Sequence, residues 1–169
     1  MSRPERNEAE AYYFKYIDQV SQDDVVAVMA RQIEDCGRIF NGISEEKSLH
    51  RYAPEKWSIR QVLNHLTDNE RSFVFRALWF GRGFTDPVAG FDQNIAANGA
   101  RADEYSWARH VAEFREVRAA TLAFFRNLPA EGWKRGGVAN GNFVTVNALA
   151  YIIAGHLEHH MVILQERYL

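Results

Sequence analysis

The chain has 169 residues, of which 47% are hydrophobic and 25% charged, with 20 Lys and Arg against 22 Asp and Glu. This size and composition predict one globular domain over residues 1–169 and argue against intrinsic disorder. No block of basic residues could neutralise a row of phosphates, and no apolar run is long enough to span a membrane. We therefore expect neither nucleic acid nor a membrane as a partner.

The N-terminal residues are charged and lack the apolar stretch of a signal peptide, which predicts a cytoplasmic protein. Residues 1–20 are expected to form an N-terminal arm. Cys36 is the only cysteine, so no internal disulfide can form, and we expect this side chain to be buried in the core.

Helical patterns begin after this arm. Apolar residues recur every three or four positions, which predicts an amphipathic helix over about residues 22–41. Ser58 and Gln61 form the S-x-x-Q pattern of a capping box, so a second helix is expected to begin here and to run to about Phe80. Residues 82–102 are rich in Gly, Asn and Asp, which predicts a long connection with about one helical turn.

Two further helices and a hairpin are predicted in the second half of the chain. Apolar periodicity indicates a helix from about Asp103 to Asn127. Asn140 and Gly141 between short β-prone segments are typical of a two-stranded hairpin, and Thr145 can cap a final helix. Four long helices and one hairpin predict an all-α fold, a four-helix bundle with a small β-hairpin before the last helix.

Two histidines lie on the predicted inner face of the last helix. His156 and His160 are four residues apart, hence one turn apart on one face, and they continue the apolar stripe of Leu149 and Ile153. A buried imidazole needs partners for both nitrogens, and a shared divalent metal ion can bond one nitrogen of each ring. For this pair alone, two core histidines bonded to neighbouring side chains are the alternative.

His65 in the second helix is the candidate for a third ligand. It lies at the rim of the apolar stripe of that helix, so its side chain can point between the helices or into solvent. Three histidine ligands leave at least one coordination position open, which is typical of a catalytic rather than a structural site. His159 lies three residues from His156 on the other side of the helix, so we expect it at the rim and not among the ligands.

Other residues are candidates by their position. Those expected to support the ligands or to contact a substrate are Trp57, Asp68, Asn69, Arg82, Phe91, Asp92 and His159. Arg82, Phe91 and Asp92 belong to the long connection, whose length favours a functional role. His50 and His110 have no partner at ligand spacing, and we expect both on the surface.

A resemblance to a known family rests on many of the same residues. The motifs that carry it are Tyr52-Ala53-Pro54-Glu55-Lys56-Trp57-Ser58, Val62-Leu63-Asn64-His65 with Asp68 and Glu70, Arg76, Leu78, Arg82-Gly83, Pro87, Gly90-Phe91-Asp92-Gln93, Ala154-Gly155-His156-Leu157-Glu158-His159-His160 and Glu166-Arg167-Tyr168. Over about residues 12–169 the sequence resembles the DinB-like (damage-inducible) metalloprotein family. The resemblance implies an antiparallel four-helix bundle, often a homodimer, whose histidine triad binds Zn, Ni or Fe and corresponds to His65, His156 and His160. The sequence departs from the family at Leu157, where members often have a polar or acidic residue.

Three functions are compatible with such a site. The first is a metal-dependent S-transferase or isomerase that uses a low-molecular-weight thiol and a small-molecule substrate; the resemblance favours it, because characterised relatives include such enzymes. The second is a metal-dependent hydrolase, ranked lower because the sequence has no H-E-x-x-H motif to supply a general base. The third is a bundle that binds a metal without catalysis.

Overall fold

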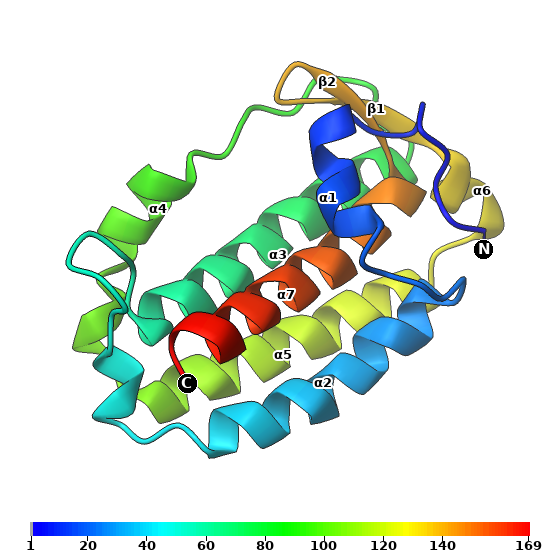
Figure 1. Cartoon of the computed structure of the whole chain (residues 1–169). Coiled ribbons are helices and arrows are strands. Elements are labelled where there is room, and N and C mark those ends of the chain that lie inside the picture. The colour runs from blue at the N-terminus through cyan, green and yellow to red at the C-terminus, as the bar shows by residue number, and fades with distance from the viewer. Residues whose placement is uncertain (1) are drawn as a thin grey trace.

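The structure is a computed structural model that describes residues 2–169. Its elements in chain order are α1 (Phe14–Ile17), α2 (Val25–Asn41), α3 (Ile59–Gly81), α4 (Gln93–Ala100), α5 (Trp107–Arg126), α6 (Ala130–Lys134), β1 (Gly136–Ala139), β2 (Asn142–Thr145) and α7 (Val146–Arg167). Short 3₁₀ helices occupy Ala11–Tyr13, Lys47–Leu49 and Ala102–Glu104. The long helices α2, α3, α5 and α7 lie side by side, and the antiparallel hairpin precedes α7 (Figure 1). The predicted all-α bundle with a small hairpin is confirmed.

The helix and strand ends follow the local sequence. Ser58 Oγ accepts a hydrogen bond from Gln61 N at 3.1 Å, and Ser58 N donates to the Gln61 side chain at 3.0 Å, so the capping box is complete. The hydroxyl of Thr145 accepts a backbone hydrogen bond at 3.0 Å and caps α7. Asn140 and Gly141 have φ values of 52° and 79°, as the tight turn of a two-residue hairpin requires.

The four long helices do not simply alternate in direction. Helix α3 runs antiparallel to α7, and α2 runs antiparallel to α5, whereas α3 and α5 run in the same direction (Figure 1). The physical cause is the connection over residues 82–106, which returns along the bundle before α5 begins. This connection contains α4, whose 8 residues make it longer than the single turn predicted.

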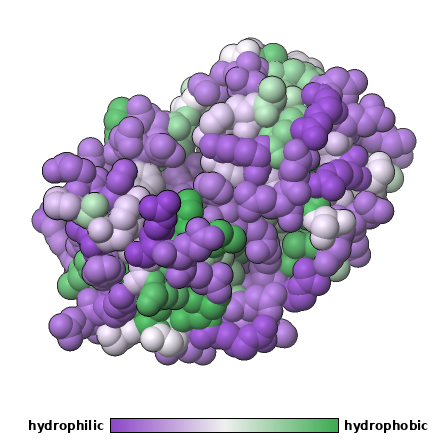
Figure 2. Space-filling view, in the orientation of Figure 1, coloured by the Kyte–Doolittle hydropathy of each residue, from purple (hydrophilic) through white to green (hydrophobic). Residues whose placement is uncertain are grey.

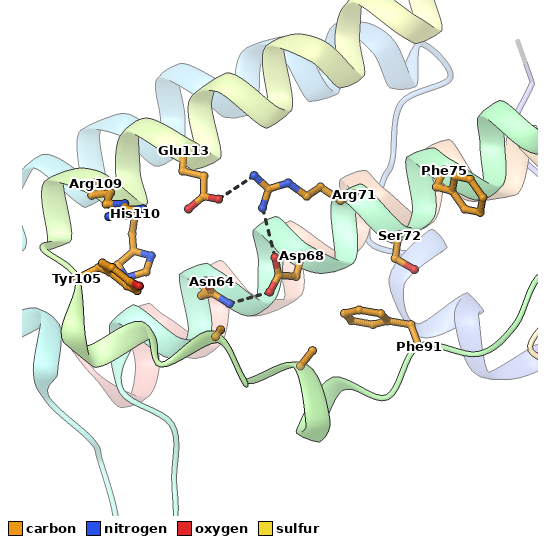
Figure 3. A pocket seen from close by; sticks show the side chains of 12 residues that line it. Asn64, Asp68, Arg71, Ser72, Phe75, Phe91, Tyr105, Arg109, His110 and Glu113 are labelled. Carbon is orange, nitrogen blue, oxygen red and sulfur yellow. Dashed lines mark hydrogen bonds and ion pairs between the residues drawn. The ribbon is translucent and has the colours of Figure 1, made fainter. Parts of the chain in front are cut away.

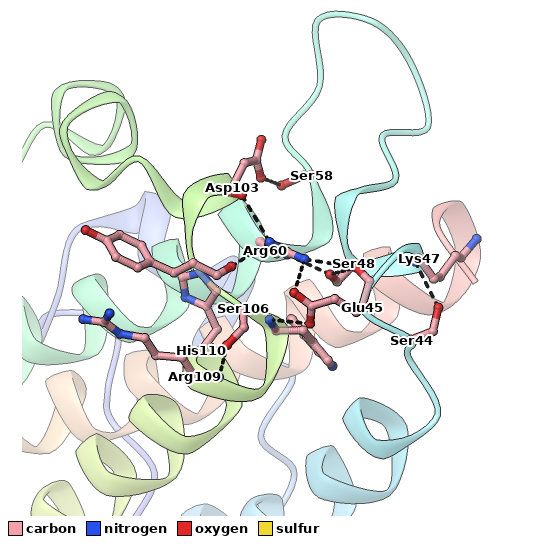
Figure 4. A network of polar contacts seen from close by, with 12 residues as sticks. Ser44, Glu45, Lys47, Ser48, Ser58, Arg60, Asp103, Ser106, Arg109 and His110 are labelled. Atoms are coloured by element: carbon pink, nitrogen blue, oxygen red, sulfur yellow. Dashed lines mark hydrogen bonds and ion pairs between the residues drawn. The ribbon is translucent and has the colours of Figure 1, made fainter.

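A buried arginine fastens the start of α3 to the loops around it. Arg60 is 5% exposed and donates to Ser48 Oγ at 2.8 Å and to Glu45 Oε1 at 2.6 Å (Figure 4). It also donates to Tyr105 O at 2.6 Å, at the end of the long connection. This network fixes the end of α3 from which His65 projects.

The core lies between the inner faces of the helices, and Cys36 belongs to it with 3% exposure, as predicted. On the face seen in Figure 2 the surface is mainly hydrophilic, with a small hydrophobic area near the C-terminal end of α7. Within residues 2–169, no helix combines the length and apolar character needed to cross a membrane.

Gly155 allows the N-terminal arm to pack directly on α7. A Cβ atom at this position would overlap the carbonyl group of Tyr16, which follows the buried Phe14 in α1. We therefore expect Gly155→Ala to displace α1 and to lower the free energy of unfolding by roughly 1–3 kcal/mol. Urea unfolding measures this loss. Gly99→Ala is the matched control, because a Cβ at Gly99 meets no atom within 4 Å; equal midpoints for the two variants would contradict the close packing.

Candidate metal centre

Three histidines from two antiparallel helices converge inside the bundle. His65 comes from α3, and His156 and His160 come from α7. His65 Nε2 lies 3.2 Å from His156 Nε2, and one ring nitrogen of each of the three residues lies within 4.8 Å of the others. His65 and His156 are 5% and 6% exposed, and His160 is half-buried. The sequence left open whether the His65 side chain points between the helices or into solvent. The structure shows that it points between the helices.

The spacing of the ring nitrogens fits one metal ion. Two nitrogens bonded to an ion at about 2.0–2.1 Å with tetrahedral angles are roughly 3.3 Å apart. The separation of 3.2 Å between His65 and His156 is close to this value. A hydrogen bond can pair only two of the three nitrogens, whereas one ion can bond all three.

Burial keeps the three imidazoles neutral. It lowers the pKa of His65 from 6.5 to about 4 and the pKa of His160 to about 3, and it holds the pKa of His156 well below the ordinary value. The neighbouring histidines add a smaller effect in the same direction for His156 and His160. A neutral imidazole keeps a lone pair on one nitrogen, which is the form that binds a metal.

Without metal, the protein is expected to lose stability as the pH falls from about 6.5 to about 4. In this range the histidines of the unfolded chain bind protons, while His65 and His160 of the folded chain stay neutral, so acid favours the unfolded state. The slope approaches about 1.4 kcal/mol per pH unit for each such histidine. Urea unfolding of EDTA-treated protein measures it. His65→Gln should give a shallower slope, and an unchanged slope would contradict the assignment.

The side chains next to the triad include Asn69, Trp57 and Tyr16. Asn69 Nδ2 lies 3.0 Å from His65 Nδ1 and donates to His65 O at 2.9 Å. When His65 Nε2 binds a metal, Nδ1 carries the proton, and Asn69 would accept this hydrogen bond through Oδ1 after a flip of its amide group, which would fix the orientation of the ring. The ring of Trp57 lies 4.8 Å from that of His65, and the ring of Tyr16 lies 5.1 Å from that of His156. Asn69 and Trp57 are among the residues predicted from the sequence. Tyr16 was not predicted, since the repeated tyrosines of the arm were its only indication.

Most of the other predicted contacts lie away from the triad. Arg82 is the C-cap residue of α3, at the end opposite His65. Asp92 accepts hydrogen bonds from two backbone N–H groups of α4 at 2.8 and 3.0 Å, so its carboxylate is used as a helix cap. Asp68 bonds to two other α3 side chains and faces α5 (Figure 3). His159 is partly buried beside the triad, and its ring lies 5.3 Å from that of His160. The structure thus brings His159 near the triad but not Arg82, Asp92 or Asp68.

Cavities lie on two sides of the triad. One of about 130 Å³ is lined in part by His156, and another of about 220 Å³ is lined in part by His160. A larger cavity of about 700 Å³ lies between α3, α4 and α5, with Arg71 and Glu113 paired in its wall (Figure 3). Phe91 lines both this cavity and the one at His156, which places the long connection over the approach to the triad.

His110 is buried, which makes the prediction of a surface position wrong. It is 3% exposed, and its Nε2 lies 2.8 Å from Ala102 O. The 3₁₀ helix of the connection covers a face of α5 that the bundle itself leaves open, and the periodicity of α5 alone could not indicate this cover. His50 is exposed, as predicted.

The fold and the site together define a class of protein, a four-helix bundle that carries a three-histidine candidate metal centre between α3 and α7. Residues 29–164 match the sequence model of the DinB superfamily. The chain therefore belongs to the DinB superfamily, which confirms the family that the sequence motifs indicated.

A solved structure supports the fold. The chain is similar to YfiT from Bacillus subtilis, described as a probable metal-dependent hydrolase with an unusual four-helix bundle topology. The TM-score is 0.73 and the sequence identity is 18%, over 97% of this chain and 91% of the YfiT chain. At this identity the similarity shows the fold alone. A comparison with curated protein sequences finds no match.

Proposed function

We propose that this protein is a metal-dependent enzyme that transfers the sulfur of a low-molecular-weight thiol to an electrophilic small molecule. The observation that carries the proposal is the convergence of three neutral histidine nitrogens beside two cavities, at His156 and at His160. Three protein ligands leave a coordination position for a small molecule. A divalent Zn, Ni or Fe ion held there would stabilise the thiolate, the nucleophilic form of a thiol, at neutral pH.

Two carboxylates near His156, Glu70 on α3 and Glu158 on α7, favour a thiol over water because neither is free to act as a base. Glu70 accepts hydrogen bonds from Arg118 at 2.8–3.0 Å, and Glu158 accepts one from Gln32 at 2.8 Å. Both carboxylates are therefore engaged in structural bonds. The ordinary pKa of a thiol is about 8.5 and that of water about 15.7, so a thiol needs less help from a side-chain base.

Hydrolysis is the second candidate, and the similarity to YfiT favours it. In this case water would take the place of the thiol as the nucleophile. The same histidines would hold the ion, and Asn69 would orient His65 in the same way. The two candidates therefore differ in the nucleophile and not in the protein groups that position it.

One protein preparation can distinguish the candidates. Metal-loaded protein is incubated with an activated aryl halide and a series of low-molecular-weight thiols, and separately with activated esters and amides without thiol. S-transfer is supported if halide is released only when thiol and metal are both present. This release should be lost in His156→Ala and should persist in His159→Ala. Ester or amide cleavage with the same dependence on His156 supports hydrolysis. Bound metal without turnover in either assay would indicate a bundle that only binds metal.

A further inference from the structure

Arg76 is a buried cation without an anion to pair with. It lies on α3, is 5% exposed, and its Nε has no hydrogen-bond partner in the structure. One Nη atom donates a long hydrogen bond, 3.4 Å, to Ala89 O, and the uncharged hydroxyl of Tyr13 lies beside the guanidinium. The two other buried arginines of residues 2–169 are paired, Arg60 with Glu45 at 2.6 Å and Arg118 with Glu70 at 2.8 Å.

The burial of Arg76 costs free energy unless an anion compensates for the lost hydration. Burial lowers the pKa of Arg76 below its ordinary value, because the charged form is the one that water stabilises. An unpaired buried charge of this kind is expected at a functional site more than in an ordinary core. The Nε atom is closed off from solvent, so the end of the guanidinium that carries the two Nη groups is the part that a ligand can reach. The two Nη groups can bind a carboxylate through two parallel hydrogen bonds.

The cavity that Arg76 lines leads to the triad. Arg76 and His156 both line the cavity of about 130 Å³. The guanidinium carbon lies 5.6 Å from the centre of the Phe73 ring, and this ring lies 6.2 Å from that of His156. Phe73 therefore lies along one wall between the cation and the triad. Asn69 and Tyr16 line the same cavity, and Figure 2 shows a hollow in the surface between the α4 segment and α1.

We propose that this cavity binds an elongated ligand whose carboxylate pairs with Arg76 while its other end reaches the histidine triad. Among the residues that line this cavity only Arg76 carries a charge, and a carboxylate matches this single charge. That the other end is a thiol rests on the proposed function. That the far end is a carboxylate rests on the unpaired Arg76 and not on the proposed function. The ligand class is thus a thiol that carries a carboxylate at the far end of its chain.

A binding series tests the two ends together. Cobalt-substituted protein is titrated with ω-mercaptocarboxylates of increasing chain length and with mercapto-alcohols of the same lengths, and binding is followed by the thiolate-to-cobalt absorption band. We expect one chain length to bind best, with the carboxylate at least about tenfold tighter than its alcohol, as a charge-assisted hydrogen bond gives. Arg76→Gln should reduce this ratio to about one. A ratio of one in the wild type would overturn the proposal.

A second measurement tests the carboxylate end without metal or thiol. Alkyl carboxylates of the same lengths are expected to raise the melting temperature of EDTA-treated wild-type protein and to leave that of Arg76→Met unchanged. Equal stabilisation of both proteins would overturn the inference. A third outcome is that carboxylates stabilise the protein only when Arg76 is present, while no thiol binds to the cobalt-substituted protein. This outcome would support the anion subsite and contradict the proposed thiol chemistry.

The ligand-free variants separate a binding role from a structural one. Without ligand, Arg76→Met should melt at a higher temperature than the wild type, because an unpaired buried charge is removed. Arg118→Met, the matched control, should melt at a lower temperature because its partner Glu70 is left unpaired. A fall in melting temperature for Arg76→Met would show that Arg76 serves the fold and would overturn the proposal.

Discussion

Metal content is expected to fall from about one ion per chain to nearly none when His65, His156 or His160 is replaced by alanine. Each histidine offers one nitrogen to the shared site, and the three nitrogens lie within 4.8 Å of one another. The two histidines that remain in a variant cannot supply the missing third nitrogen. Zinc sites with four ligands contribute about 10–16 kcal/mol in total. The loss of one ligand therefore corresponds to about 3–4 kcal/mol, or roughly 10²–10³-fold in affinity.

Elemental analysis of tag-free protein and competition with a chromogenic chelator measure this effect. His159→Ala is the matched control, because His159 lies on the same helix and its ring contacts that of His160, yet it is outside the cluster. Zinc should raise the melting temperature of the wild type and of His159→Ala, and should leave the three triad variants unchanged. Metal retained by His65→Ala, or lost from His159→Ala, would contradict the triad.

Much of the architecture follows from local sequence patterns. The first residues of α3 and α7 could be predicted because Ser58 and Thr145 cap these helices through hydrogen bonds to residues three positions further along the chain. The hairpin could be predicted because Asn140 and Gly141 accept positive φ. The pair His156 and His160 was recognisable for the same reason, since helical spacing alone sets the two rings on one face.

Features that depend on distant parts of the chain could not be predicted. The parallel direction of α3 and α5 results from the course of the long connection, and composition does not fix that course. His110 is buried by this connection, and Tyr16 reaches the triad only because Gly155 leaves room for the arm. Arg76 and Arg118 are both buried, but only Arg118 has an anionic partner, and this partner, Glu70, comes from another helix.

Arg118→Met is expected to lower the free energy of unfolding of the metal-free protein by about 3–5 kcal/mol, a large part of the stability of an ordinary domain. Arg118 is fully buried and donates to both oxygens of Glu70 at 2.8–3.0 Å and to Gln32 Oε1 at 2.6 Å. Gln32 in turn donates to Ala154 O at 3.0 Å and to Glu158 at 2.8 Å. One network thus joins α2, α3, α5 and α7, and the variant leaves Glu70 as an unpaired buried anion.

Urea unfolding of EDTA-treated protein measures the loss. Asp35→Asn is the matched control, because it breaks the exposed ion pairs with Arg31 and Arg38 and should change the stability by less than about 0.5 kcal/mol. An Arg118→Met variant as stable as Asp35→Asn would show that the buried pair contributes little.

The double variant Glu70→Leu with Arg118→Met separates the cost of an unpaired charge from the value of the pair itself. Each single substitution leaves one buried charge alone, whereas the double substitution leaves none, so we expect it to be more stable than either single variant. A double variant whose loss of unfolding free energy equals the sum of the two single losses would show that the unpaired charges are not the cause. Because Ala154 and Glu158 lie on either side of His156 in α7, the network also positions the His156 side chain. The single variants should therefore bind zinc about tenfold more weakly even where they remain folded, and the chelator competition used for the triad variants measures that change.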